Sequence, residues 1–171
     1  MSRIAIIGGH GKVALHLSRI LSGEGHDVTS FIRNPDHVAD VTGTGATAQV
    51  LDVENSTTAE LAQALKGHDA VVWSAGAGGG NPARTYAVDR DAAIRSMDAA
   101  KEAGVKRYVM VSYIGSAKDH GIPQDHPFFP YAESKAAADD YLRRASGHFG
   151  TAGPDTSVAD AGPQSQGGRF P

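Results

Sequence analysis

Apolar and polar residues form blocks along the first 146 residues, and most blocks have the spacing of a strand or of a helix. A continuous apolar run at residues 4–7 predicts a buried strand over residues 3–7. Apolar side chains then recur every three or four positions through residues 12–22, which predicts an amphipathic helix. Three glycines lie in the short segment between them. The chain therefore begins with a strand, a tight turn and a helix.

The same alternation continues along the chain, with short β-rich runs followed by segments of helical periodicity. Strands are expected at residues 3–7, 27–32, 46–51, 69–74 and 107–112, and helices at residues 12–22, 36–42, 57–65, 84–103 and 131–146. Strands that alternate with helices predict an α/β fold with a doubly wound parallel sheet. Right-handed crossovers give this sheet the Rossmann-type strand order 3-2-1-4-5.

Some apolar residues are expected to face the core. Ile94, Met97 and Ala100 form the apolar stripe of the helix over residues 84–103. Trp73 ends the fourth strand and is expected to pack in the interior.

Residues 147–171 break the pattern, because they are rich in Gly, Pro, Ser and Asp and have almost no apolar periodicity. This composition is typical of a flexible tail, and the alternative is an ordered, irregular segment along the sheet edge. We therefore divide the chain into a Rossmann domain over residues 1–146 and an irregular or flexible tail over residues 147–171.

Composition narrows the range of functions. A chain of 171 residues with a net charge of −3 fits one domain and gives no electrostatic case for binding nucleic acid or an anionic membrane. The absence of cysteine excludes disulfides and thiolate metal sites, and the histidines lack metal-ligand spacing with acidic partners. No apolar run approaches the roughly 18–20 residues of a membrane span. We expect a soluble, cytoplasmic protein without a metal site.

The first turn has the spacing Gly8-x-x-Gly11-x-x-Ala14, which differs from the strict G-x-G-x-x-G pattern. Gly8 can adopt a backbone angle that a side chain forbids, and Gly11 lets the chain approach a pyrophosphate closely. The following helix N-terminus offers N–H groups and a partial positive charge to phosphates. The pattern predicts a dinucleotide-binding turn, and a generic tight turn is the alternative.

Arg33 ends the second strand, about 20 residues after Gly11, where dinucleotide-binding folds meet the adenosine ribose. Arginine there complements a 2′-phosphate through charge-assisted hydrogen bonds, which favours NADP over NAD. Lys12 adds charge near the same phosphates, and His10 either approaches them or is a neutral turn residue. The alternative for Arg33 is an ordinary solvated side chain.

Two further strand ends carry candidate cofactor contacts. Asp52 follows the third strand and either accepts from an adenine amino group, with Val53 packed on the ring, or caps a helix. The fourth strand leads into a second glycine-rich turn, where Ala75 and Gly76 leave room for a ribose and a nicotinamide. The alternative for this turn is a floppy loop.

Tyr131 and Lys135 are four residues apart and share one face of a predicted helix. An ammonium beside a phenol makes the tyrosinate more accessible, which suits acid–base chemistry. Ser112 ends the fifth strand and is a candidate to polarise a substrate carbonyl. The spacing of Tyr131 and Lys135 is common by chance, and a solvated helix face is the alternative.

Six segments together resemble the short-chain dehydrogenase/reductase superfamily, and more narrowly its atypical NAD(P)H-binding branch. They are IIGGHGKVA at 6–14, FIRNPD at 31–36, LDV at 51–53, WSAGAG at 73–78, VKRYVMVSYIG at 105–115 and PYAESKAAAD at 130–139. The resemblance covers about residues 3–146.

This resemblance implies a Rossmann-type fold, bound NADP(H) and a hydride transfer that belongs to the nicotinamide. The implied cofactor-binding residues are Gly8, His10, Gly11, Lys12, Val13, Arg33, Asp52, Val53, Ala75 and Gly76. The implied catalytic set is Ser112, Tyr131 and Lys135. In this set Tyr131 donates or accepts the proton, while Lys135 lowers the pKa of the Tyr131 phenol and binds the ribose.

The chain departs from the family after residue 146, where relatives continue with a sixth strand. No apolar run of that kind follows here, so we expect the sixth strand to be missing and the chain to be truncated or out of frame relative to its relatives. If no adjacent reading frame of the gene encodes a strand-like peptide, the hypothesis of an out-of-frame ending is contradicted. A bare fifth strand invites association, so we also expect a homodimer, formed through this edge or through the helices over 84–103 and 131–146.

Three functions fit these observations. The first is an NADP-dependent oxidoreductase that acts on a small carbonyl or quinone-like substrate. The second is a non-catalytic NADP(H)-binding redox sensor or regulatory protein, since the atypical branch often keeps the cofactor and loses catalysis. The third is an epimerase or dehydratase that uses bound NAD(P) transiently.

Overall fold

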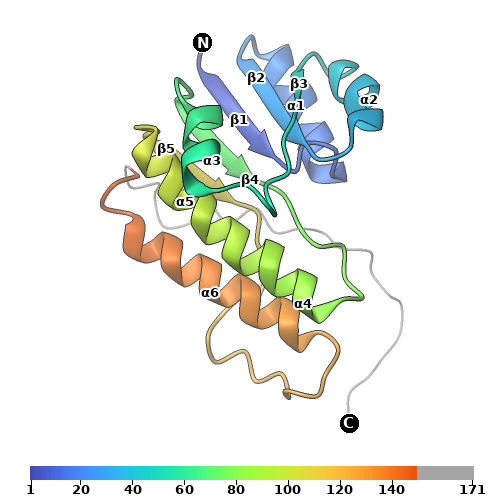
Figure 1. Cartoon of the computed structure of the whole chain (residues 1–171), viewed down its shortest axis with the longest axis vertical. Coiled ribbons are helices and arrows are strands. Elements are labelled where there is room, and N and C mark those ends of the chain that lie inside the picture. The colour runs from blue at the N-terminus through green and yellow to red at the C-terminus, as the bar shows by residue number, and fades with distance from the viewer. Residues whose placement is uncertain (150–171) are drawn as a thin grey trace.

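The computed structural model describes residues 1–149, which form a five-stranded sheet with helices on both faces (Figure 1). The strands are β1 (Arg3–Ile7), β2 (Asp27–Ile32), β3 (Thr47–Val50), β4 (Ala70–Trp73) and β5 (Arg107–Met110). Every neighbouring pair is parallel, and the order is β3-β2-β1-β4-β5. The predicted fold class, strand order and strand positions are confirmed.

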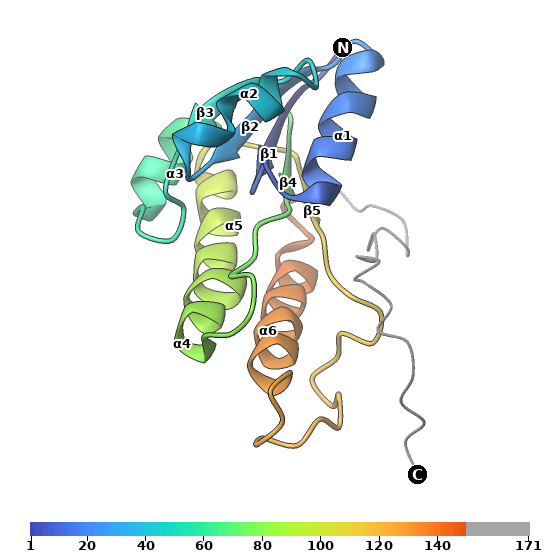
Figure 2. The same cartoon turned by 90° about the vertical axis from the view of Figure 1, so that its right-hand side faces the viewer.

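The helices divide between the two faces of the sheet. They are α1 (Lys12–Gly23), α2 (Val38–Thr42), α3 (Thr58–Leu65), α4 (Pro82–Thr85), α5 (Ala93–Glu102) and α6 (Phe129–Ala145), with a 3₁₀ turn η1 (Pro35–His37) and a π-helical segment η2 (Tyr86–Ala92). Figure 2 shows α1 on the opposite side of the sheet from α3 and α5. In both views α6 runs beside α5.

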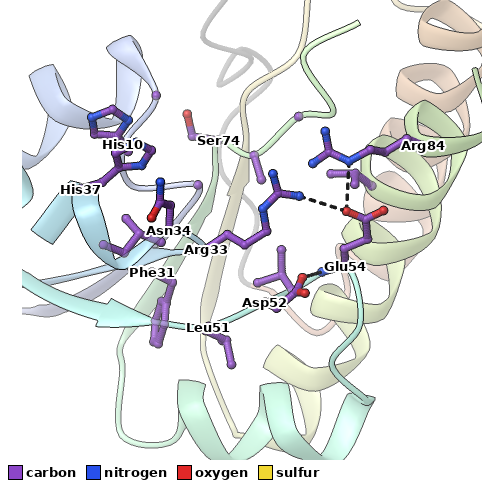
Figure 3. Close-up of a pocket in the computed structure, with 17 residues that line it drawn as sticks. His10, Phe31, Arg33, Asn34, His37, Leu51, Asp52, Glu54, Ser74 and Arg84 are labelled. Atoms are coloured by element: carbon purple, nitrogen blue, oxygen red, sulfur yellow. Dashed lines mark hydrogen bonds and ion pairs between the residues drawn. The ribbon is translucent and has the colours of Figure 1, made fainter. Parts of the chain in front are cut away.

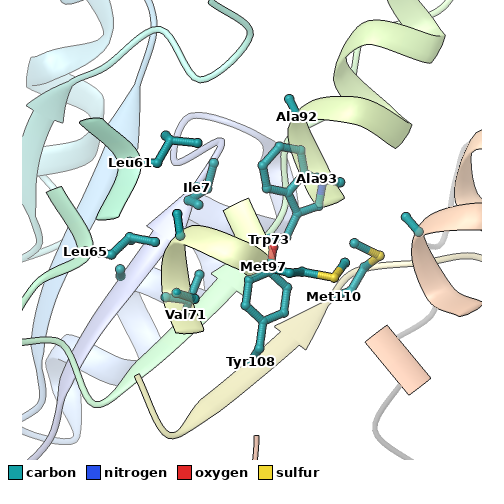
Figure 4. Packing of buried hydrophobic residues seen from close by; sticks show 14 of the residues in the cluster. Ile7, Leu61, Leu65, Val71, Trp73, Ala92, Ala93, Met97, Tyr108 and Met110 are labelled. Carbon is teal, nitrogen blue, oxygen red and sulfur yellow. The ribbon is translucent and has the colours of Figure 1, made fainter. Parts of the chain in front are cut away.

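Alternation along the strands produces two cores. In β1, Ile4 and Ile6 pack under α1 and α2, whereas Ala5 and Ile7 face the helices α3, α5 and α6. Trp73 is fully buried, as predicted, in the core that faces α3, α5 and α6, and it lies close to Met97 of α5 (Figure 4). Burial on both faces explains why the strands are nearly continuous apolar runs.

The predicted helix over residues 84–103 differs in its start and its regularity. It begins two residues earlier, because the Asn81 side chain accepts from the N–H of Arg84 at 3.1 Å and Pro82 occupies the first turn, where a missing N–H costs nothing. The segment η2 then interrupts the α-helical ladder with wider turns, and Val88 and Asp89 within it are both buried. Ile94, predicted on the buried stripe, is only half-buried.

The end of the described chain stays attached to the core. Phe149 is buried and its ring centroid lies 5.5 Å from that of Tyr108 in β5. The proposed boundary at residue 146 therefore precedes a packed residue, and the remainder of the proposed tail, residues 150–171, lies outside the described residues. Within residues 1–149, β5 pairs with β4 alone.

None of the helices formed by these residues is long and apolar enough to cross a membrane.

A capping box starts α3, the helix whose buried face carries Leu61 and Leu65. Thr57 Oγ1 accepts from the N–H of Glu60 at 3.2 Å, and Glu60 Oε2 accepts from the N–H of Thr57 at 2.8 Å.

We expect Thr57→Ala to lower the free energy of unfolding by about 1 kcal/mol, because it removes the hydroxyl that satisfies an otherwise unpaired N–H group. Chemical denaturation measures the change. Thr58→Ala, at the next position, is the matched control and is expected to have a smaller effect. Equal losses in the two variants would contradict a capping role for Thr57.

Candidate functional site

Two adjoining cavities open at the carboxyl edge of the sheet. The first, of about 300 Å³, lies over the ends of β1, β2 and β3. The second, of about 960 Å³, lies between the start of α1, the loop after β4 and the start of α6. They share Gly11, Ser74, Ala75 and Gly76, so one elongated ligand can occupy both. In doubly wound sheets this edge is where ligands bind.

The predicted cofactor residues line these two cavities. Those on the first cavity are Gly8, His10, Gly11, Arg33, Asp52, Val53, Ala75 and Gly76. Lys12 and Val13 line the second. Four strand-to-helix turns, far apart in the sequence, are thus brought to one edge.

The turn after β1 is packed between two neighbouring strands. The N–H groups of Gly8 and Gly9 both donate to the carbonyl of Phe31 in β2, at 3.1 and 2.9 Å. Gly8 has a φ of +82°, and a Cβ there would lie 2.5 Å from the Cα of Ala75 after β4. Only glycine fits this position.

Gly11 plays a different part, since a Cβ there would meet protein atoms at ordinary distances of 3.4 Å or more. It is the N-cap of α1 and supplies no side-chain hydrogen bond to the helix start. The first-turn N–H groups of a helix have no partner within the helix, and they point toward any anion bound there. This cradle fits a diphosphate group.

Arg33 points into the first cavity and has an exposed guanidinium group, as Figure 3 shows. Its Nη1 lies 3.4 Å from Oε2 of Glu54, and the same oxygen is 3.2 Å from Nε of Arg84. Arg84 also donates to the carbonyl of Ala77 at 3.0 Å. Arg33 therefore shares a carboxylate with a second arginine, which the sequence did not reveal.

Asp52 serves its own loop. Its side chain accepts from the N–H of Glu54 at 3.1 Å and from the side-chain amide of Asn55 at 2.7 Å. The hydrogen bond from Asn55 is the largest cause that lowers the pKa of Asp52 below its ordinary value. The helix-cap interpretation of Asp52 is wrong, because Thr57 caps α3. Its predicted contact with adenine stays a prediction.

His10 is held by the helical segment after β2. Its Nε2 lies 2.8 Å from Oδ2 of Asp40, and its ring stacks on that of His37 with centroids 3.5 Å apart. Both rings line the first cavity. His10 thus has protein partners on two sides, while its predicted approach to phosphate stays untested by this geometry.

The second cavity brings Tyr131 and Lys135 together on one face of α6. Lys135 is buried, and its Nζ donates to the carbonyl of Val111 just after β5 at 2.5 Å. The ring centroids of Tyr113 and Phe128 lie 5.6 and 5.2 Å from that of Tyr131. Two further aromatic rings therefore line the cavity beside the tyrosine–lysine pair.

Ser112 is not among the residues that line this cavity. It is buried, and its Oγ donates to Oδ2 of Asp139 on α6 at 2.5 Å, an oxygen that also accepts from Ser116. The neighbouring residue, Tyr113, faces the cavity instead. The structure thus joins two of the three predicted catalytic residues, and the role predicted for Ser112 stays a prediction.

Asp89 is a cavity residue that the sequence reading missed. It is 2% exposed, lines the second cavity and accepts from the N–H of Ala77 at 3.0 Å. Burial is the largest cause that raises the pKa of this carboxyl, against the opposing hydrogen bond and the charges of Lys135 and Arg84. A signal existed, because Asp89 falls on the helical stripe that continues through Ala93 and Met97.

A parallel sheet of this order, with a glycine turn over its edge and a tyrosine–lysine pair on α6, defines the Rossmann-type proteins of the short-chain dehydrogenase/reductase and epimerase class. The sequence profile of the NAD(P)H-binding family matches residues 8–151. The chain belongs to this family, and the predicted relationship is confirmed.

Known relatives resemble this chain over most of its length. It is 38% identical over 117 residues to the UPF0659 protein C216.03 of Schizosaccharomyces pombe, covering 67% of this chain and 47% of that protein. It is 32% identical over 147 residues to the uncharacterized sugar epimerase YhfK of Bacillus subtilis, covering 85% and 67%. A putative NAD-dependent epimerase/dehydratase from Bacillus halodurans superposes with a TM-score of 0.75 at 30% identity, covering 84% and 65%. The matched region thus spans about half the length of the fission-yeast relative.

We expect Asp89→Asn to gain stability relative to the parent protein as pH rises from about 4 to about 7. The raised pKa means that the folded protein binds more protons than the unfolded chain, whose carboxyl titrates near 3.8, so ionisation above that pH costs stability. Asparagine keeps an acceptor for Ala77 and does not ionise. Urea unfolding at each pH measures the difference.

Asp91→Asn is the matched control, since Asp91 lies in the same segment and is exposed. A stability difference between Asp89→Asn and the parent protein that is constant with pH would contradict a desolvated carboxylate at position 89.

Proposed function

We propose that this protein is an NADP(H)-dependent oxidoreductase that acts on a small carbonyl or quinone-like substrate. The observation that carries the proposal is the continuity of the two cavities across Gly11. One cavity holds the guanidinium group of Arg33, and the other holds Tyr131 and Lys135. A dinucleotide laid across the turn would reach from a 2′-phosphate near Arg33 to a nicotinamide near Tyr131.

The residues present fit such a ligand. The Gly8–Gly11 turn leaves the start of α1 open to a diphosphate, and the exposed guanidinium group of Arg33 suits a phosphate monoester. When bound, the cofactor supplies or accepts the hydride.

The protein's own task is then proton transfer and orientation. Tyr131 would give its phenolic proton to the substrate oxygen during reduction. The ammonium group of Lys135, held by the carbonyl of Val111, stabilises the phenolate that results. The rings of Tyr113 and Phe128 favour a planar, unsaturated substrate beside Tyr131, because aromatic faces pack well on such groups.

A second candidate is an epimerase or dehydratase that uses bound NAD(P) transiently. It is favoured by the names of two relatives, the uncharacterized sugar epimerase and the putative NAD-dependent epimerase/dehydratase. Tightly retained dinucleotide without net redox change would support this candidate. Binding of NADPH without turnover on a panel of carbonyls and quinones would favour a redox sensor.

We expect Tyr131→Phe to lower kcat for substrate-dependent NADPH oxidation by about 10²–10⁴-fold, because a positioned proton donor contributes that much. The dissociation constant of NADPH is expected to change little. Tyr141→Phe is the matched control, since this hydroxyl on the same helix donates to Asp98 at 2.6 Å. Unchanged turnover in Tyr131→Phe would contradict the proposed proton transfer.

We expect Arg33→Ala to weaken NADPH binding by about tenfold or more and NADH binding far less, because only NADPH carries the 2′-phosphate. Calorimetric titration of both dinucleotides measures the two effects. Arg19→Ala, which removes an exposed charge from α1, is the control. Equal losses for NADPH and NADH would remove the reason to prefer the phosphorylated cofactor.

A further inference from the structure

Glu54 stands between two arginines at the first cavity. Its Oε2 lies 3.4 Å from Nη1 of Arg33 and 3.2 Å from Nε of Arg84 (Figure 3). The three side chains come from different segments: the end of β2, the loop after β3 and α4. The guanidinium group expected to meet a 2′-phosphate therefore has a carboxylate partner within the protein.

Two of these three groups are fixed in place. The main chain at Glu54 is held by Asp52, which accepts its N–H at 3.1 Å, and by Arg95, which donates to its carbonyl at 2.8 Å. Arg84 is tied to the carbonyl of Ala77 at 3.0 Å as well as to Glu54. The pair Glu54–Arg84 therefore connects the loop after β3 to the loop after β4.

Arg33 is the loosely held member. Its side chain is 57% exposed, against 34% for Arg84, and it makes the longer of the two contacts with Glu54. Exposed ion pairs are weak and exchange readily. An arriving phosphate can thus draw Arg33 away, while Arg84 stays on Glu54 and keeps that carboxylate neutralised.

We propose that Glu54 sets the cofactor preference of this protein by competing with the 2′-phosphate for Arg33. The proposal rests on the proposed NADP(H) function. A 2′-phosphate must break the Arg33–Glu54 pair before it gains the guanidinium group, whereas a dinucleotide with a 2′-hydroxyl can leave the pair intact. Glu54 therefore lowers the ratio of the NADH dissociation constant to the NADPH dissociation constant. It acts as a positioning residue, because its effect on the cofactor passes through Arg33.

The test is calorimetric titration of NADPH and NADH into the full chain at low ionic strength. It uses the parent protein, Glu54→Gln, Arg33→Ala and the double variant. The measured quantity is the ratio of the NADH dissociation constant to the NADPH dissociation constant. Glutamine has the same shape without the charge, and Glu102→Gln, at the exposed end of α5, is the matched control.

We expect Glu54→Gln to raise this ratio about fivefold, which corresponds to the loss of one partly exposed ion pair. In the Arg33→Ala background the same change is expected to leave the ratio unaltered, because the two effects are coupled. Glu102→Gln is expected to behave as the parent protein. Should Glu54→Gln fail to fold, Glu54→Asp withdraws the carboxylate from Arg33 and is expected to raise the ratio in the same direction.

An unchanged ratio in Glu54→Gln would overturn the inference. So would an equal rise in the Arg33→Ala background, which would assign the effect to direct repulsion of the phosphate by Glu54. Both results leave the proposed NADP(H) function intact, provided that Arg33→Ala still weakens NADPH selectively. If the folded parent protein binds neither dinucleotide, the proposed function fails, and this inference fails with it.

Discussion

The structure depends on the close contact between the first glycine turn and the ends of two strands. The Phe31 carbonyl accepts from both Gly8 and Gly9, while Gly8 approaches the backbone of Ala75 so closely that no side chain fits. This contact fixes the start of α1 over the sheet edge and sets the boundary between the two cavities. A side chain at position 8 would separate β1 from the loop after β4, and the surface for a diphosphate would be lost with it.

Two carboxylates near this turn are held in different ways. Asp89 is buried in a π-helical segment, and burial raises its pKa despite the nearby charges of Lys135 and Arg84. One carboxylate oxygen of Glu54 lies between the guanidinium groups of Arg33 and Arg84, which would otherwise repel each other. Carboxyl groups with perturbed pKa values, such as that of Asp89, cluster at functional sites.

The strands, their order and part of the core could be predicted from the sequence, because local patterns of apolar residues encode them. Strand order, strand positions and the buried state of Trp73 follow from apolar periodicity and crossover handedness. The interruption of the long helix at η2 and its earlier start at Pro82 were not predicted, since one depends on packing and the other on the Asn81 cap. Side-chain partners were not predicted either: the hydroxyl of Ser112 donates to Asp139 on α6, a contact that no local pattern indicates, while the role predicted for Ser112 stays a prediction.

By itself the sequence determined the α/β class, the glycine turn, and the arrival of Arg33, Tyr131 and Lys135 at one edge of the sheet, because parallel strands place all their carboxyl ends together. Only the tertiary structure decided which charges meet there. Glu54 and Arg84 are 30 residues apart, and their pairing depends on how the loop after β3 and the helix α4 are brought side by side. Such contacts carry no periodic signal in the chain, so they emerge only when the packed elements fix the distance between two side chains.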